Sequence, residues 1–98
     1  MITITAIITV TPGSDALMAA ELLKVAAHVR ANEPDTIDFF ISQSRDNPCR
    51  FTTYERFTDA AAMDRHNGSD AVAVFFAAVK PHLAEPVILE TCTELSAK

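Results

Sequence analysis

The chain has 98 residues, of which 49% are hydrophobic, and its 8 Lys and Arg against 13 Asp and Glu give a formal charge of -5. These values predict one folded domain over residues 1–98 with a modest core, and they exclude a disordered segment. The basic residues are scattered, and no apolar run approaches the roughly 18 residues of a membrane span. We therefore expect neither a nucleic acid nor a membrane as a partner.

The first half of the chain predicts a strand, a helix and a second strand. Residues 2–11 alternate Ile with Thr, which is typical of a strand and not of a signal peptide. Ser14 is a good N-cap for a helix from Asp15 to about Asn32, and "ANEP" ends that helix. Residues 36–44 form the second predicted strand, with Ile37, Phe39 and Ile41 on one face.

The second half begins with a hairpin loop, "RDNPC", and a third strand over residues 50–58. Thr58 is the expected cap of a short helix that runs to His66 and is ended by Gly68. Ser69 is the expected cap of another helix, and residues 85–95 supply the last strand. One face of the third strand carries Phe51, Thr53, Glu55 and Phe57; the other carries Thr52, Tyr54 and Arg56.

This order, βαββαβ, predicts an α+β, ferredoxin-like fold with a four-stranded antiparallel sheet and helices on one face only. The opposite face would carry threonines together with single large side chains. Such a mixed face favours burial against a second sheet in a homodimer, although a half-exposed face with scattered apolar residues is also common. The large side chains expected on this face are Ile7, Phe40, Tyr54 and Cys92.

No motif for a nucleotide, a metal or a nucleophilic serine is present, so no cofactor and no metal are predicted. Cys49 and Cys92 are too few for a disulfide framework, which favours a reduced, cytoplasmic setting. His28 and His82 are expected to be ordinary surface histidines near helix ends.

Glu55 and His66 are the two residues for which a functional and a structural role compete. Glu55 lies on the apolar face of its strand, so it is either paired with an arginine such as Arg65 or Arg30, or placed at the mouth of a cavity. His66 either caps the end of its helix or takes part in a site.

The stretches "ANEP" and "FTTYERFTDAAAMDRHNGSDAVAVFF" resemble the antibiotic biosynthesis monooxygenase domain, over Ile4 to about Glu94. The most specific part is the run Tyr54–Phe57, followed by Asp59, Ala62, His66 and Ser69. The resemblance implies a dimeric α/β barrel in which each protomer holds its own pocket. Members include cofactor-independent oxygenases of quinols and polyketides, haem-degrading enzymes and an isomerase of a phosphorylated sugar derivative.

Departures from the family patterns narrow the choice among these types of family member. Ala6 and Phe76 stand where haem-degrading relatives carry an asparagine and the haem-ligating histidine, which argues against haem. Thr53, Phe57 and Met63 replace the asparagine, tryptophan and tyrosine of the polyketide oxygenases. The pattern with Glu55 and His66 is similar to the quinol monooxygenase-like and isomerase-like members.

The resemblance therefore implies an acid–base pair, His66 and Glu55, in a cofactor-free monooxygenase that uses molecular oxygen on a small quinol or other enolisable substrate. The pocket residues it implies are Phe39, Phe51, Thr53, Phe57, Phe75 and Phe76. One alternative is an acid–base isomerase, whose phosphorylated substrate would need Arg30, Arg45 or Lys80 near the pocket. The other alternative is a dimeric binding or stress-response barrel without catalysis.

Overall fold

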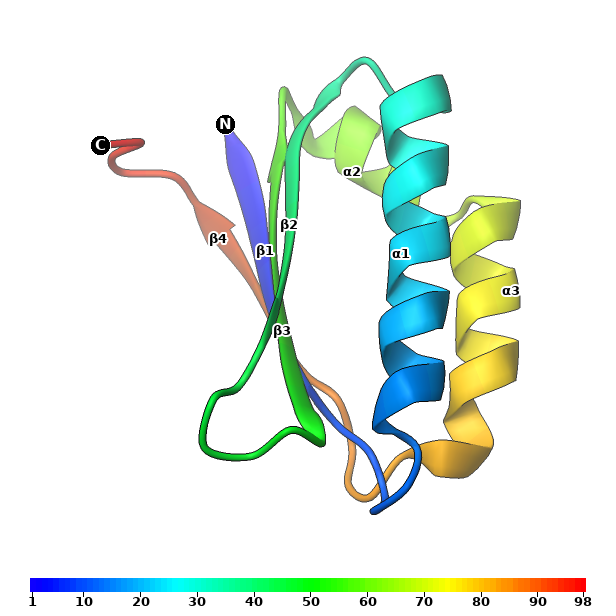
Figure 1. The fold of residues 1–98 in the computed structure, drawn as a ribbon. Helices are drawn as coiled ribbons and strands as arrows, with labels where there is room; N and C mark the ends of the chain where they lie inside the picture. The colour runs from blue at the N-terminus through cyan, green and yellow to red at the C-terminus, as the bar shows by residue number, and fades with distance from the viewer.

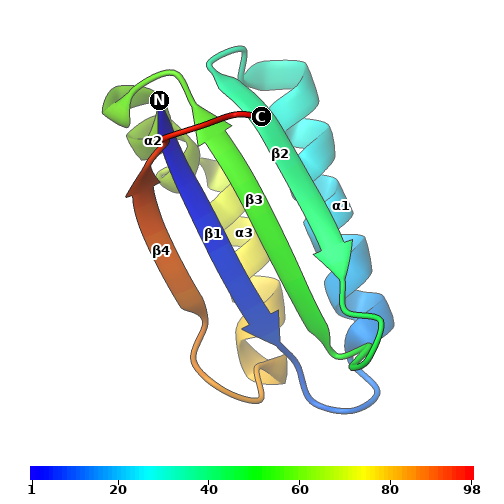
Figure 2. The same cartoon turned by 90° about the vertical axis from the view of Figure 1, so that its left-hand side faces the viewer.

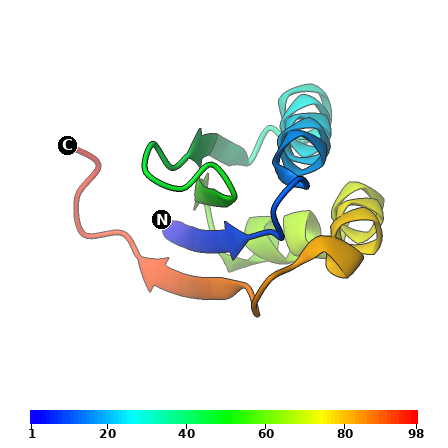
Figure 3. The same cartoon turned by 60° about the horizontal axis from the view of Figure 1, so that its bottom comes forward.

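The computed structural model describes residues 1–98, and its elements follow the predicted order. All of the helices lie on one side of the sheet (Figure 1), and a view from below shows the same two layers (Figure 3). The strands pair in the order β2-β3-β1-β4, with every pair antiparallel, which confirms the ferredoxin-like fold. None of these helices combines the length and the apolar character needed to cross a bilayer. The elements are β1 (Ile2–Thr9), α1 (Asp15–Asn32), β2 (Thr36–Gln43), β3 (Arg50–Phe57), α2 (Ala60–Asn67), α3 (Asp70–Val79), a 3₁₀ turn (Lys80–His82) and β4 (Ile88–Thr93).

Strand β3 has the alternation that the sequence predicts. Phe51, Thr53, Glu55 and Phe57 are buried under the helices, whereas Thr52 and Tyr54 are exposed on the other face. The strand lies between β1 and β2, so a polar side chain on its covered face is surrounded by protein. This central position is why Glu55 cannot reach bulk water.

Strand β2 departs from the prediction at Ile37. The pairing with β3 shifts between Thr36 and Asp38, so Thr36 lies opposite Phe57 while Asp38 lies opposite Arg56. An extra residue at such a bulge reverses the alternation of faces. The prediction that Ile37 shares the covered face with Phe39 is therefore wrong, and Ile37 is 44% exposed.

Helix α1 begins and ends at the predicted residues, but Ser14 does not cap it with its side chain. The Ser14 hydroxyl instead lies 3.1 Å from Oγ1 of Thr11 and 3.0 Å from Nδ1 of His82. His82 thus ties the exit of α3 to the entry of α1.

The caps of the two later helices decide where His66 lies. Helix α2 is capped by Asp59, whose carboxylate accepts a hydrogen bond from the backbone N–H of Ala62 at 2.8 Å, so the prediction of Thr58 as the cap is wrong. An aspartate one residue later wins because its carboxylate accepts this bond more strongly than a hydroxyl. Ser69 caps α3 and Gly68 follows α2, as predicted.

The core has two parts, both between the helices and the covered face of the sheet. In the smaller part, Ile4 and Phe57 pack against Ala62 of α2. The larger part joins α1 and α3 to the centre of the sheet and consists of Ile8, Val10, Met18, Leu22, Val25, Val29, Phe51, Phe75 and Val79. The core residues that come from α1 are those of the apolar stripe predicted from the sequence.

The other face of the sheet is uncovered, and the end of the chain crosses one end of it (Figure 2). Arg56 lies on this face, where its guanidinium binds Asp38 and Glu94, each at 2.6 Å. Phe40, Tyr54 and Ile88 are exposed there as well.

Candidate acid–base site

Glu55 and His66 meet between β3 and α2. Nε2 of His66 lies 3.2 Å from Oε1 of Glu55, and the two residues are only 6% and 4% exposed. Oε2 of Glu55 accepts a hydrogen bond from the Thr53 hydroxyl at 2.7 Å. They meet because α2 starts soon after β3 and lies on the covered side of the sheet, near the end of the strand (Figure 1).

The expected arginine partner of Glu55 is not found, whereas His66 does lie in the last turn of α2, as an interaction with the helix dipole requires. No arginine pairs with Glu55, because Arg65 binds Asp35 at 3.0 Å, near the surface. His66 does not extend along the helix end towards solvent; its ring is buried against the sheet. The end of α2 is instead completed by the Ser69 hydroxyl, which donates to the carbonyl of His66 at 2.8 Å.

A second carboxylate binds the other ring nitrogen. Nδ1 of His66 donates to Oε1 of Glu33 at 2.8 Å. The same oxygen accepts a hydrogen bond from the Thr36 hydroxyl at 2.8 Å. His66 therefore lies between two carboxylates that come from different parts of the chain.

The environment of the His66 ring favours its charged form. Burial disfavours the imidazolium, but the contacts with Glu55 and then Glu33 outweigh burial and raise the pKa of His66 above its ordinary value of 6.5. The rings of Phe57 and Phe39 lie 5.3 and 5.5 Å from the imidazole and limit its rotation. The site thus holds a titratable cation in a fixed orientation.

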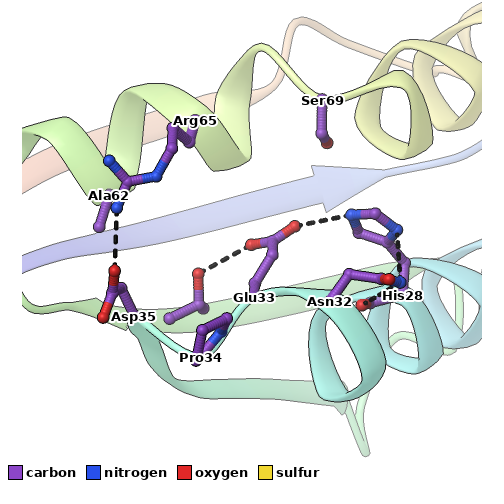
Figure 4. Close-up of a pocket in the computed structure, with 9 residues that line it drawn as sticks. His28, Asn32, Glu33, Pro34, Asp35, Ala62, Arg65 and Ser69 are labelled. Atoms are coloured by element: carbon purple, nitrogen blue, oxygen red, sulfur yellow. Dashed lines mark hydrogen bonds and ion pairs between the residues drawn. The ribbon is translucent and has the colours of Figure 1, made fainter.

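Glu33 is the site residue that the sequence analysis missed, and His28 accompanies it. Nε2 of His28 lies 3.0 Å from Oε2 of Glu33, an ion-pair distance without hydrogen-bond alignment (Figure 4). One signal was available: Glu33 is a carboxylate at the C-terminal end of a helix, where the helix dipole disfavours negative charge. An anion in that place indicates a cationic partner elsewhere in the fold.

A cavity of about 60 Å³ opens beside this pair, and both Glu55 and His66 line it. Its wall is apolar except for Thr53, Glu55, His66 and Asn67. Phe39, Phe75 and Phe76 also line it, whereas Phe51 and Phe57 do not, because both are packed completely into the core. The cavity walls come from all four strands and from α1, α2 and α3.

A second hollow of about 420 Å³ lies on the solvent side of Glu33 and is mostly polar. His28, Asn32, Asp35 and Arg65 line it together with Glu33 (Figure 4). The hydrogen bond between Glu33 and His66 is thus the link between this hollow and the apolar cavity.

The apolar cavity lacks the features expected for the two alternative functions, an isomerase of a phosphorylated substrate and a non-catalytic barrel. Arg30, Arg45 and Lys80 do not line it, so it has no cation for a phosphate group. A non-catalytic barrel was expected to pair Glu55 with an arginine and to turn His66 to solvent, and both differ from what is observed.

Comparisons with known proteins agree with this geometry. The family model described as antibiotic biosynthesis monooxygenase matches residues 1–78. Protein SO0527 from Shewanella oneidensis is 33% identical, with a TM-score of 0.84 over 93% of this chain and 87% of that one. A candidate antibiotic biosynthesis monooxygenase from Caulobacter crescentus is 25% identical, with a TM-score of 0.90 over 97% and 90%.

A similar candidate from Nitrosomonas europaea is 22% identical and shows the same fold, with a TM-score of 0.90 over 98% of this chain and all (100%) of that one. No functionally characterised protein matched closely enough to add to these. The match over residues 1–78 shows that the chain belongs to the antibiotic biosynthesis monooxygenase family.

Proposed function

We propose that the protein is a cofactor-independent monooxygenase that acts on a small quinol or another enolisable substrate held in the apolar cavity. The observation that carries this proposal is the buried contact between Glu55 and His66 on a cavity wall that is otherwise almost entirely apolar. A carboxylate in such surroundings is costly unless it is paired and used. Family membership points to the same general class of reaction.

The chemistry requires only proton transfer from the protein. Glu55 takes the proton of a phenolic or enolic O–H group, and the resulting anion passes electrons to molecular oxygen. One oxygen atom enters the substrate, and the other leaves as water with two hydrogens of the substrate, so a quinol becomes a hydroxyquinone without an external reductant. The charged His66 next to Glu55 stabilises the carboxylate form that starts this step.

The cavity must widen to admit such a substrate. Its volume of about 60 Å³ is well below the roughly 300–1,000 Å³ of ordinary small-molecule sites. Phe76 lines the cavity and is 41% exposed, so its ring can move outward with little loss of packing in the core. We assign Phe76 as the side chain at the entrance.

Oxygen uptake with a panel of quinols tests the proposal. Glu55→Gln keeps the size of the side chain but removes the base, and we expect turnover to fall roughly 10²- to 10⁴-fold. Glu85→Gln is the matched control, since Glu85 is exposed and lines neither the apolar cavity nor the polar hollow. Equal uptake in both variants would remove Glu55 from the mechanism, and turnover that continues without oxygen would point to an isomerase.

We also propose that two copies pair through the uncovered faces of their sheets. Phe40, Tyr54 and Ile88 are exposed on that face, and no helix covers them. A chain of this size has little burial to spare, and a sheet face can supply the roughly 1,200 Å² that stable interfaces remove.

Light scattering at micromolar concentration tests the homodimer. Tyr54→Asp places an unpaired charge in the proposed interface and should weaken the dimer by about 3–5 kcal/mol. Leu23→Asp adds the same charge on the exposed side of α1 and should leave the mass unchanged. A monomer mass for the unchanged protein would contradict the proposal.

A further inference from the structure

Glu33 contacts the candidate site without touching the cavity. It does not line the apolar cavity, and its only contact with the site is the 2.8 Å hydrogen bond to Nδ1 of His66. Any effect of Glu33 on a substrate must therefore pass through the imidazole ring.

The two ring nitrogens of His66 are held differently. Nδ1 makes an aligned hydrogen bond to Glu33, whereas Nε2 has a longer ion-pair contact of 3.2 Å with Glu55. Both Glu33 and Glu55 can only accept, but only the contact at Nδ1 has hydrogen-bond alignment, so a neutral ring is expected to keep its hydrogen on Nδ1. A neutral imidazole has one N–H, and when it sits on Nδ1 the free lone pair is on Nε2, towards Glu55 and the cavity.

We propose that Glu33 is a positioning residue: it keeps Nδ1 of His66 protonated, so that Nε2 is the nitrogen that exchanges a proton with Glu55. This inference rests on the proposed acid–base function. In each exchange one N–H bond at Nε2 breaks as one O–H bond at Glu55 forms, or the reverse, and the hydrogen on Nδ1 stays in place.

The position of Glu33 is itself fixed from several sides. Thr36 donates to Oε1, and His28 lies beside Oε2, so the carboxylate has one defined orientation. Glu33 follows the last turn of α1, where the carbonyl ends disfavour an anion and so favour its contact with the His66 imidazolium.

The charged groups around His66 are limited to this set. Glu33 faces it from the end of α1 and Glu55 from β3, while His28 acts through Glu33. Arg65 of α2 and Asp35 pair with each other at the surface. The titration of His66 should therefore respond chiefly to changes at Glu33 and Glu55.

Nitrogen-15 NMR of the histidine rings tests the assignment without any substrate. In the unchanged protein we expect neutral His66 to carry its hydrogen on Nδ1. In Glu33→Met, which keeps the chain length but removes the acceptor, the hydrogen should move to Nε2, where Glu55 still accepts it, and the titration midpoint should fall. Glu85→Met is the matched control and should change neither the tautomer nor the titration midpoint of His66. A hydrogen on Nε2 in the unchanged protein would overturn the proposal, as would an unchanged tautomer in Glu33→Met.

Glu33→Gln provides a second variant if the methionine variant does not fold. Its amide oxygen can still accept from Nδ1, so the tautomer should be retained while the loss of charge lowers the titration midpoint. An unchanged midpoint would contradict the role of the Glu33 charge.

Kinetics then separate this inference from the proposed function. In Glu33→Met, kcat should fall on the order of 100-fold with KM nearly unchanged, since the imidazole that exchanges a proton with Glu55 has the wrong tautomer but the cavity is intact. In Glu33→Gln, kcat should be much higher than in Glu33→Met, and the pH profile of kcat should be shifted relative to the unchanged protein. If the tautomer switches as expected but the unchanged protein consumes no oxygen with any quinol, the proposed function fails while the assignment of Glu33 stands.

Discussion

Two neighbouring residues of β3, Glu55 and Arg56, belong to clusters with the same arrangement of charges on opposite faces of the sheet. Each cluster places one cation between two carboxylates. On the covered face, His66 lies between Glu33 and Glu55. On the uncovered face, Arg56 lies between Asp38 and Glu94.

The cation decides what each cluster can do. The hydrogen bonds that Arg56 donates to Glu94 and Asp38 raise its pKa still further above its already high value, so Arg56 never exchanges a proton. It ties β2 and β3 to the residue that follows β4, which is a structural task. His66 can gain and lose a proton, its pKa is raised by the two carboxylates, and it lines a cavity, which together suit acid–base chemistry.

Removal of each cation should show the largest difference between the clusters. His66→Ala leaves the buried Glu55 without its cation and removes one partner of Glu33, and the free energy of unfolding should fall by about 3–5 kcal/mol. Arg56→Met should cost less, because water can reach the partly exposed Asp38. Urea denaturation of both variants at neutral pH measures the difference.

An equal loss of unfolding free energy in the two variants would contradict this expected difference. It would indicate that the Arg56 cluster is as dry as the His66 cluster, as it would be inside the proposed dimer. Repeating the measurement at several protein concentrations separates this case, since the stability of a dimer depends on concentration.

The pH dependence of stability should come from the His66 cluster and not from Arg56. Because the pKa of His66 is raised in the folded state, its contribution to stability is complete below about 6.5, the value of an unfolded histidine. The contribution is lost as the pH rises through the folded-state pKa. The stability difference between the unchanged protein and His66→Gln should therefore shrink as the pH rises from about 6.5 through the folded-state pKa. A difference that grows with pH would show that the pKa is lowered instead.

The smallest expected effect concerns the helix that carries His66. Asp59→Ala removes the cap of α2 and should lower the free energy of unfolding by about 1 kcal/mol. Thr58→Ala removes the adjacent side chain, which makes no capping bond, and serves as the control. Thermal unfolding measures both, and an equal shift in the two variants would assign the cap to Thr58 after all.

Much of the fold could be predicted from local patterns. The stripe of α1 and the alternation in β3 are spacing effects, so their buried faces follow directly from the sequence. The errors occur where a single residue competes with its neighbour. Asp59 replaces Thr58 as a cap, and the bulge at Ile37 depends on how β2 pairs with β3, which no local pattern records.

The candidate site was only partly predictable. Glu55 and His66 were selected because a carboxylate on an apolar strand face and a histidine at a helix end are unusual for their positions. Glu33 was missed because it lies 33 positions before His66, and its contact exists only after α1 and α2 pack on the same sheet face.

The sequence by itself determined which residues form strands and helices and which of their faces are apolar, since these follow from periodicities of two and about 3.6 residues. Only the tertiary structure decided the partners of His66. The end of α1, strand β3 and the end of α2 bring Glu33, Glu55 and His66 to one point. The distances between them decide the charge of the imidazole, because Coulomb interactions depend on separation in space and on local burial, not on separation along the chain.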